Sequence, residues 1–212
     1  MIISIDKLIS KYDLSINTLL HVGACRAEEK RAYLSNGVKK IIWVEANPAL
    51  CEFLEQKVAD ENNIIVNAAV SQKDGEIVTF NFANNEQSSS ILPLGTHKQL
   101  FPGVYYTNRA FLETKSLKSI LEELKVGKED VDFINLDIQG AELLALKGCG
   151  EEYLNNIQGV YTEINTEYVY ENCALVGEID DFLGHYGFER VETKMWDNNH
   201  PWGDAFYLKG GK

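Results

Sequence analysis

Positive charge is scarce in this chain. Of its 212 residues, 20 are Lys or Arg and 32 are Asp or Glu, so the formal net charge is −12. No run of basic residues marks a local patch that would offset this balance. Because an acidic surface repels phosphate backbones, we expect no nucleic-acid partner.

Long apolar segments and paired cysteines are also lacking. No apolar run is long enough to span a bilayer, and residues 1–16 lack the basic and apolar regions of a signal peptide. The four cysteines show no C-x-x-C spacing, which predicts reduced thiols and gives no reason to expect a metal site. These absences together predict a cytoplasmic protein.

What the sequence does contain is a regular alternation of apolar strands and helices. A short helix is expected within residues 1–16. Buried strands are then expected at 18–23, 40–45, 63–70, 131–137 and 158–164, with a further strand at 76–82 and a closing pair at 188–193 and 204–208. The pattern predicts one α/β domain over residues 1–212, with a doubly wound, mostly parallel sheet and an antiparallel edge hairpin.

In such sheets, ligands bind beyond the carboxyl ends of the strands. Glu45 ends the second expected strand and follows Gly23 by 22 positions, close to the spacing of an acid that binds ribose hydroxyls. A carboxylate can accept hydrogen bonds from both hydroxyls of a ribose. Glu45 is therefore a candidate ribose ligand, although a solvated carboxylate at a strand end is the simpler alternative.

The glycine pattern bears on which nucleotide is bound. The loop from Gly23 to Glu28 keeps only the first glycine of the G-x-G-x-x-G motif, and Glu28 would bring negative charge close to a phosphate. S-adenosylmethionine carries no phosphate and has an ammonium group. The loop therefore favours this cofactor over a dinucleotide.

A second group of polar residues follows the fourth expected strand. Asp137 ends that strand, where a carboxylate is costly without a partner, and Glu142 lies in the first turn of the next helix, where it equally fits a helix-start role. Asp137 and Glu163, at the ends of neighbouring strands, are candidate bases. His200 is a third candidate, although an exposed loop histidine is the better interpretation of this residue.

With these residues in place, the chain resembles the FkbM-type methyltransferase family. The matching stretches are 20–29, 41–48, 66–77, 88–92, 131–148, 160–165 and 187–209, in order along nearly the whole chain. The stretch from Asp132 to Gly148 is the most specific. The first loop departs from the family pattern, which often has a second glycine where Ala27 stands and Asn or His where Cys25 stands.

The resemblance implies a class I methyltransferase fold, S-adenosylmethionine as methyl donor, and O-methylation of a sugar or other small-molecule hydroxyl. Carried over by position, Glu45 would bind ribose, while Asp137 and Gln139 would face the reacting end. The full set of expected donor contacts is His21, Gly23, Ala24, Cys25, Arg26, Glu28, Glu45, Ala46, Asn47, Ala68, Ala69, Asp137 and Gln139.

Residues 84–110 are rich in Ser, Asn, Gly and Pro and predict a long loop that covers the acceptor. Side chains of this loop and of the C-terminal segment are candidates for acceptor binding. They are Ser88, Ser89, Tyr105, Tyr106, Arg109, Trp196 and Trp202. The aromatic members could instead fill the edge of the core.

Two other functions fit part of the pattern. An NAD-dependent sugar oxidoreductase shares the fold class and the acid after the second strand, but the missing glycines and the absence of an obvious Tyr-x-x-x-Lys pair count against it. A non-catalytic adenosyl-binding module would need no carboxylate beside the sulfonium, so Asp137 argues against it. The acceptor, the oligomeric state and any metal dependence stay open at this point.

Overall fold

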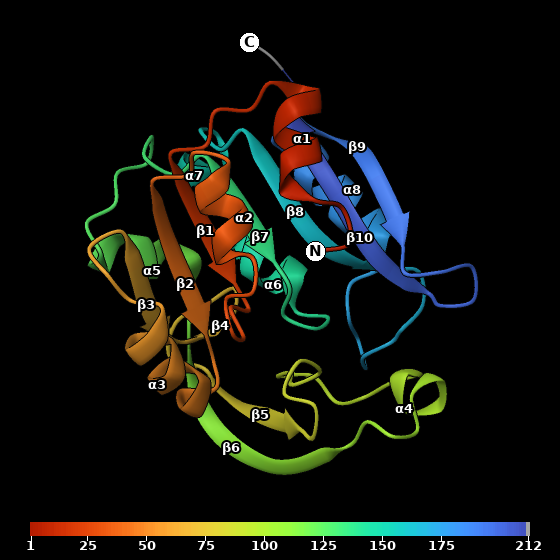
Figure 1. The fold of residues 1–212 in the computed structure, drawn as a ribbon. Coiled ribbons are helices and arrows are strands. Elements are labelled where there is room, and N and C mark those ends of the chain that lie inside the picture. The colour runs from red at the N-terminus through yellow and green to blue at the C-terminus, as the bar shows by residue number, and fades with distance from the viewer. Residues whose placement is uncertain (211–212) are drawn as a thin grey trace.

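The computed structural model describes residues 1–210, and a seven-stranded sheet forms their centre (Figure 1). The strand order is β3-β2-β1-β7-β8-β10-β9, and all pairings are parallel except those that β10 makes with β8 and β9. Its strands are β1 (Thr18–Val22), β2 (Lys40–Glu45), β3 (Asn63–Asn67), β7 (Phe133–Leu136), β8 (Gly159–Asn165), β9 (Phe188–Met195) and β10 (Trp202–Lys209). The predicted α/β fold with an antiparallel edge pair is confirmed.

The central strands are buried along their whole length because helices cover both faces of the sheet. Every residue of β1, β7 and β8 is buried. Such continuous burial is typical of parallel strands covered on both sides. Polar side chains therefore concentrate at the strand ends.

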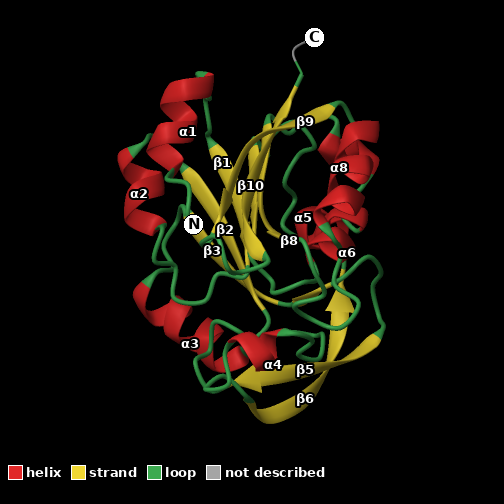
Figure 2. Cartoon of the chain, turned by 90° about the vertical axis from the view of Figure 1, so that its right-hand side faces the viewer, coloured by secondary structure: helices red, strands yellow, loops and turns green. Residues whose placement is uncertain are grey.

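The helices form two layers (Figure 2). One layer packs with Trp43 and Phe133 and consists of α1 (Ile5–Tyr12), α2 (Lys30–Ser35) and α3 (Pro48–Lys57). The opposite layer consists of α5 (Leu117–Glu123), α6 (Glu142–Lys147), α7 (Glu151–Leu154) and α8 (Val176–His185). Ser116 caps the N-terminus of α5, since its hydroxyl accepts a hydrogen bond from the Ser119 amide. Among residues 1–210, no helix combines the length and the apolar character needed to cross a bilayer.

A smaller three-stranded sheet lies beyond the carboxyl ends of the parallel strands (Figure 1). It has the order β4-β6-β5 and consists of β4 (Ala69–Val70), β5 (Ile77–Ala83) and β6 (Tyr106–Lys115); the short helix α4 (His97–Leu100) precedes β6. This sheet forms the opposite wall of the space in which a ligand of the main sheet would lie.

Two predictions about this region are wrong. The expected strand 63–70 is divided, because the Asn67 side chain binds the carbonyls of Glu45 and Ala46 and the chain then passes to the small sheet. The expected loop 84–110 ends earlier, because its last residues belong to β6. The alternation of apolar and polar residues that would mark β6 as a strand is hard to recognise in the sequence, because the apolar Phe111 is 81% exposed on the outer face.

Candidate active site

The carboxyl ends of β1, β2, β7 and β8 border a crevice made of two pockets. Four residues line both pockets, which are therefore continuous: Gly23, Cys25, Gln87 and Asp137. The narrower pocket lies over β1 and β2, and the small sheet closes it through Phe80. The wider pocket extends towards β8 and β10.

The narrower pocket is mostly apolar, with one buried carboxylate. Ala68, Ala69, Leu50 and Phe80 form its apolar walls, and Glu45 lies among them. Glu45 is 7% exposed, and each of its oxygens accepts one backbone hydrogen bond: Oε2 from the Cys25 amide and Oε1 from the Asn47 amide, both at 2.8 Å. Burial raises the pKa of Glu45 even though these hydrogen bonds lower it. The remaining lone pairs can accept two hydroxyl groups from a ligand in this pocket.

The turn after β1 brings two strand ends unusually close together. Gly23 has φ +88°, and a Cβ at this position would lie 1.8 Å from the carbonyl oxygen of Asp137. Only glycine allows this approach. Ala27, where the family often has a second glycine, is also in the left-handed region with φ +53°. The loop therefore keeps a tight conformation despite the loss of that glycine.

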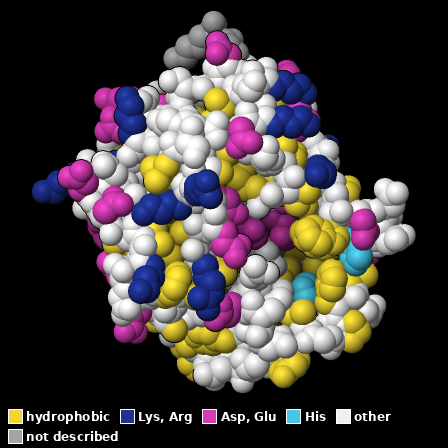
Figure 3. Space-filling model, in the orientation of Figure 1, with side chains coloured by type: hydrophobic (Ala, Val, Ile, Leu, Met, Phe, Trp, Pro, Cys, Tyr) yellow, Lys and Arg dark blue, Asp and Glu magenta, His cyan; other side chains and the backbone are white. Residues whose placement is uncertain are grey.

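The wider pocket is a cavity of about 520 Å³ with an acidic floor and an aromatic side. Figure 3 shows the acidic side chains gathered in a hollow at the centre of this face, beside hydrophobic side chains. The predicted site residues that line this cavity are His21, Gly23, Ala24, Cys25, Arg26, Glu28, Ser88, Asp137, Gln139, Glu163, Trp196 and Trp202.

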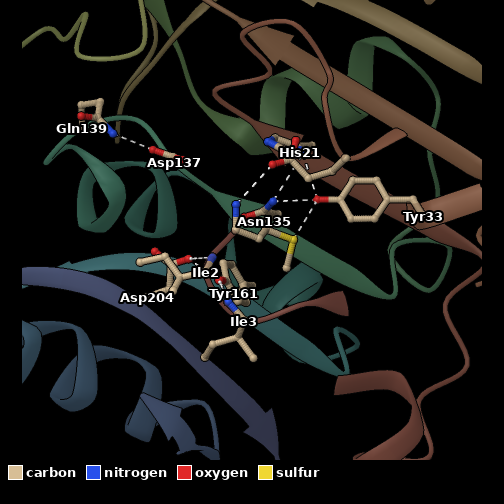
Figure 4. Close-up of polar contacts among 11 residues, drawn as sticks. Ile2, Ile3, His21, Tyr33, Asn135, Asp137, Gln139, Tyr161 and Asp204 are labelled. Carbon is tan, nitrogen blue, oxygen red and sulfur yellow. Dashed lines mark hydrogen bonds and ion pairs between the residues drawn. The ribbon is translucent and has the colours of Figure 1, made fainter. Parts of the chain in front are cut away.

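One amide joins the two predicted carboxylate bases. Gln139 Nε2 donates to Asp137 Oδ1 at 2.6 Å, a contact drawn in Figure 4, and to Glu163 Oε2 at 3.0 Å. The Tyr170 hydroxyl donates to Gln139 Oε1 at 2.6 Å, so the NH₂ group of Gln139 must face the carboxylates. Gln139 lies in the turn after β7, and its backbone adopts the left-handed conformation there, with φ +57°.

Both carboxylates hold protons more tightly than ordinary acids. Partial desolvation within the cavity and then the charge of Asp204 raise the pKa of Asp137 to about 6, although its side chain is open to solvent in the crevice. Burial and then the charge of Asp137 raise the pKa of Glu163 well above its usual range. A group with a pKa near neutrality is suited to accept a proton from a reacting hydroxyl.

Comparison with known proteins decides the family. The model of the FkbM methyltransferase domain matches residues 21–190. The chain belongs to the FkbM methyltransferase family. This assignment confirms the predicted class, a methyltransferase, and supports S-adenosylmethionine as its cofactor.

Solved structures of low identity share the fold of this FkbM methyltransferase. Magnesium protoporphyrin IX methyltransferase from Synechocystis, with bound S-adenosylhomocysteine, is 8% identical with a TM-score of 0.54, over 97% of this chain and 79% of that chain. An S-adenosylmethionine-dependent methyltransferase from Clostridium acetobutylicum is 8% identical with a TM-score of 0.52, over 98% and 89% of the two chains. No curated protein matches the sequence.

Several predicted site residues lie elsewhere in the FkbM methyltransferase structure. Tyr105, Tyr106 and Arg109 line neither pocket: Tyr105 is exposed, the Tyr106 hydroxyl donates to the Leu92 carbonyl, and Arg109 is exposed on β6. His200 also lies outside both pockets, where it contacts Asp197 at 2.7 Å and stacks on Phe101. Ala46 and Ser89 line the narrower pocket, whereas Asn47 caps α3.

Other residues of the cavity were not predicted from the sequence. Asp204 Oδ2 accepts a hydrogen bond from the Ile2 amide at 2.6 Å and another from Tyr161 (Figure 4). The Met1 ammonium contacts Glu29 Oε1 at 3.3 Å. His97, Phe101 and Tyr170 form part of the aromatic side. Of these residues, Asp204 could have been found from the sequence, because it is a carboxylate within the apolar strand β10. The remaining residues reach the cavity through contacts between segments that are distant in sequence.

Proposed function

We propose that this protein is an O-methyltransferase that transfers a methyl group from S-adenosylmethionine to a hydroxyl of a sugar, glycan or related small molecule. The observation that carries the proposal is the continuity of the crevice. A narrow apolar pocket with one anchored carboxylate joins a wide polar cavity, and a pair of amide-bridged carboxylates lies where they meet.

The narrow pocket supports a binding site for the adenosyl part of the donor. Ala68, Ala69 and Phe80 offer apolar surface to an adenine, and Glu45 offers oxygens to the ribose hydroxyls. The loop from Gly23 to Glu28 then lies beside the methionine part. In this arrangement the transferable methyl group points towards Asp137 and the wide cavity.

The residues at the junction supply positioning and a base. When bound, S-adenosylmethionine supplies a methyl group on a positively charged sulfur, which leaves as a neutral thioether. Asp137 accepts the proton of the acceptor hydroxyl as its oxygen bonds to the methyl carbon, and Gln139 holds Asp137 and Glu163 in place. Orientation of this kind lowers the activation free energy by about 7–11 kcal/mol in favourable cases. A base raises the reaction rate by roughly 10²–10⁴-fold.

The aromatic side of the cavity supports a ring-shaped acceptor. Trp196 and Trp202 are stacked, with ring centroids 5.0 Å apart, and both line the cavity. Flat apolar surfaces beside polar groups suit sugars, whose rings have apolar faces and hydroxyl edges. Ser88 adds a hydroxyl to the same cavity.

A methyl-transfer assay with isotope-labelled S-adenosylmethionine and a panel of mono- and oligosaccharides tests the proposal. We expect label in a sugar product with the wild-type protein and a loss of about 10²-fold or more with Asp137→Asn. Calorimetric titration with S-adenosylhomocysteine and with NAD is the companion experiment. Binding of NAD without binding of S-adenosylhomocysteine would favour the oxidoreductase alternative and end the proposal.

A further inference from the structure

The wide cavity is lined by more carboxyl groups than cationic groups. Its lining contains five acidic side chains, Glu28, Glu29, Asp137, Glu163 and Asp204, and the N-terminal ammonium of Met1, which is paired with Glu29 at 3.3 Å. Arg26 also lines it, but its guanidinium is bound by both oxygens of Glu86 at 3.0 Å, and Glu86 belongs to the narrower pocket. S-adenosylmethionine has a sulfonium, an ammonium and a carboxylate, and so brings one net positive charge.

The strand order divides these carboxylates between the two substrates. The narrow pocket lies over β2 and β1, and Glu28 and Glu29 follow β1. Asp137 follows β7 at the middle of the crevice, whereas Glu163 and Asp204 lie on β8 and β10, farther from the donor. Glu163 and Asp204 are direct partners across these antiparallel strands, and each is 7% exposed. This second pair therefore belongs to the acceptor end.

The aromatic side of the cavity attracts positive charge as well. Phe101, Tyr170, Trp196 and Trp202 line it together with His97. Aromatic faces attract cations through the ring quadrupole. His97 is 6% exposed, its Nδ1 has no hydrogen-bond partner, and burial lowers its pKa, so it offers a neutral ring rather than a further positive charge.

We infer that the acceptor is a hydroxylated ring compound that carries a protonated amine, of which an amino sugar is the simplest example. The inference rests on the proposed function and names the substrate class of the same site. The ammonium group lies between Glu163, Asp204 and the aromatic rings. Because a protonated amine has no lone pair, a hydroxyl beside Asp137 remains the methylated group.

The same charges oppose other classes of ligand. A phosphate or carboxylate on the acceptor would meet acidic side chains and no unpaired cation among the lining residues of this cavity, which makes nucleotide sugars and uronic acids poor acceptors. Among residues 1–210, no group of His, Cys, Asp or Glu side chains is arranged to hold a metal ion. An organic cation is therefore the fitting partner for Glu163 and Asp204.

Calorimetric titration of the protein saturated with S-adenosylhomocysteine tests the inference, with glucosamine, N-acetylglucosamine and glucose 6-phosphate as probes. We expect glucosamine to bind about tenfold tighter than its N-acetyl form and glucose 6-phosphate to give no signal. Asp204→Asn should reduce the preference for glucosamine about fivefold or more. Glu189→Gln, which removes an exposed carboxylate of β9, is the matched control and should keep the preference.

The outcomes separate this inference from the proposed function. If S-adenosylhomocysteine binds but glucosamine binds no tighter than the other probes, or if none of the three binds, the inference is wrong and the donor site stands. If S-adenosylhomocysteine itself fails to bind, the proposed function fails first.

Discussion

Glu45 holds two loops together as well as facing the narrow pocket. Its oxygens accept the amides of Cys25 and Asn47, which belong to the turns after β1 and β2. The turns are thereby fixed in the conformation in which the remaining lone pairs point into the pocket. The oxygens of Glu45 would accept hydrogen bonds from a ribose without rearrangement, which keeps the free-energy cost of binding low.

Replacing Glu45 with Ala should weaken binding of S-adenosylhomocysteine about tenfold or more, because both ribose contacts are lost and two amides lose their partner. Calorimetric titration measures the change. Glu55→Ala, at an exposed position of α3, is the control. An unchanged affinity in Glu45→Ala would remove the ribose role of this residue.

Asp137 should set the pH dependence of the reaction. Its pKa is raised to about 6, and a base must be ionised, so kcat/KM for the acceptor should rise with pH through about 6 and level off above it. Asp137→Asn should lower kcat far more than it weakens donor binding, because the amide cannot accept the proton. Asp181→Asn, at an exposed position of α8, is the control and should keep the wild-type turnover. Wild-type turnover in Asp137→Asn would exclude Asp137 as the base.

The candidate site was only partly predictable at the level of residues. Glu45 and Asp137 could be found because each ends an apolar strand, where an unexplained carboxylate stands out. Tyr170 and His97 could not, because Tyr170 lies in an irregular segment and His97 begins a helix of four residues, and neither carries a periodic pattern. The roles assigned to the predicted site residues stay proposals.

At the level of elements, the turn between β7 and α6 is built around one buried acid. Glu142 Oε1 accepts the amides of Ile138 at 3.0 Å and Gly140 at 3.1 Å, and the side chain is 1% exposed. Of the two roles considered for Glu142, the structure shows the helix-start role. Burial raises its pKa from 4.5 to about 7. The turn that carries Asp137 and Gln139 therefore depends on a group that is easier to bury in its protonated form.

This acid makes the stability of the protein sensitive to pH. Because the pKa is higher in the folded state, Glu142 contributes stability at low pH that is lost as the pH rises from about 4.5 through about 7. We expect the Tm of the ligand-free protein to fall between pH 5.5 and pH 8. In Glu142→Gln, whose amide oxygen keeps both hydrogen bonds, that fall should be smaller, and the remainder comes from Asp137 and Glu163, whose pKa values are raised as well. An unchanged slope by calorimetry would contradict this role.

The contact between the ends of β1 and β7 depends on Gly23. A Cβ there would overlap the Asp137 carbonyl, and the φ of +88° alone costs other residues about 1–3 kcal/mol. Gly23→Ala should therefore lower Tm and abolish binding of S-adenosylhomocysteine. Gly75→Ala, at a similar φ of +77° but with open space around it, is the control and should affect only Tm. Full binding by Gly23→Ala would contradict the proposed donor site.

The elements of the main sheet could be predicted, but those of the small sheet could not. Strands such as β2 are short apolar runs, and the order of the strands along the chain leaves few alternatives. β6 exposes the apolar Phe111 and buries the polar Thr114, so the usual alternation of buried apolar and exposed polar residues does not mark it. Its identity as a strand depends on pairing with β5, which is a contact between distant segments.

At the level of the whole molecule, the strand order separates the two substrates. The proposed donor pocket lies over β2 and β1, the proposed base follows β7, and the acidic pair of the proposed acceptor end lies on β8 and β10. The small sheet closes the donor pocket from the other side. The organisation of residues 1–212 as one domain stays a prediction, and residues 211–212 lie outside the described part of the chain.

A crystal structure of the protein with S-adenosylhomocysteine is the most direct measurement of the central claim. We expect the adenine beside Ala68 and Ala69, both ribose hydroxyls on Glu45, and the sulfur facing Asp137 and the wide cavity. A nucleoside bound outside the narrow pocket, or one whose ribose does not contact Glu45, would contradict the account.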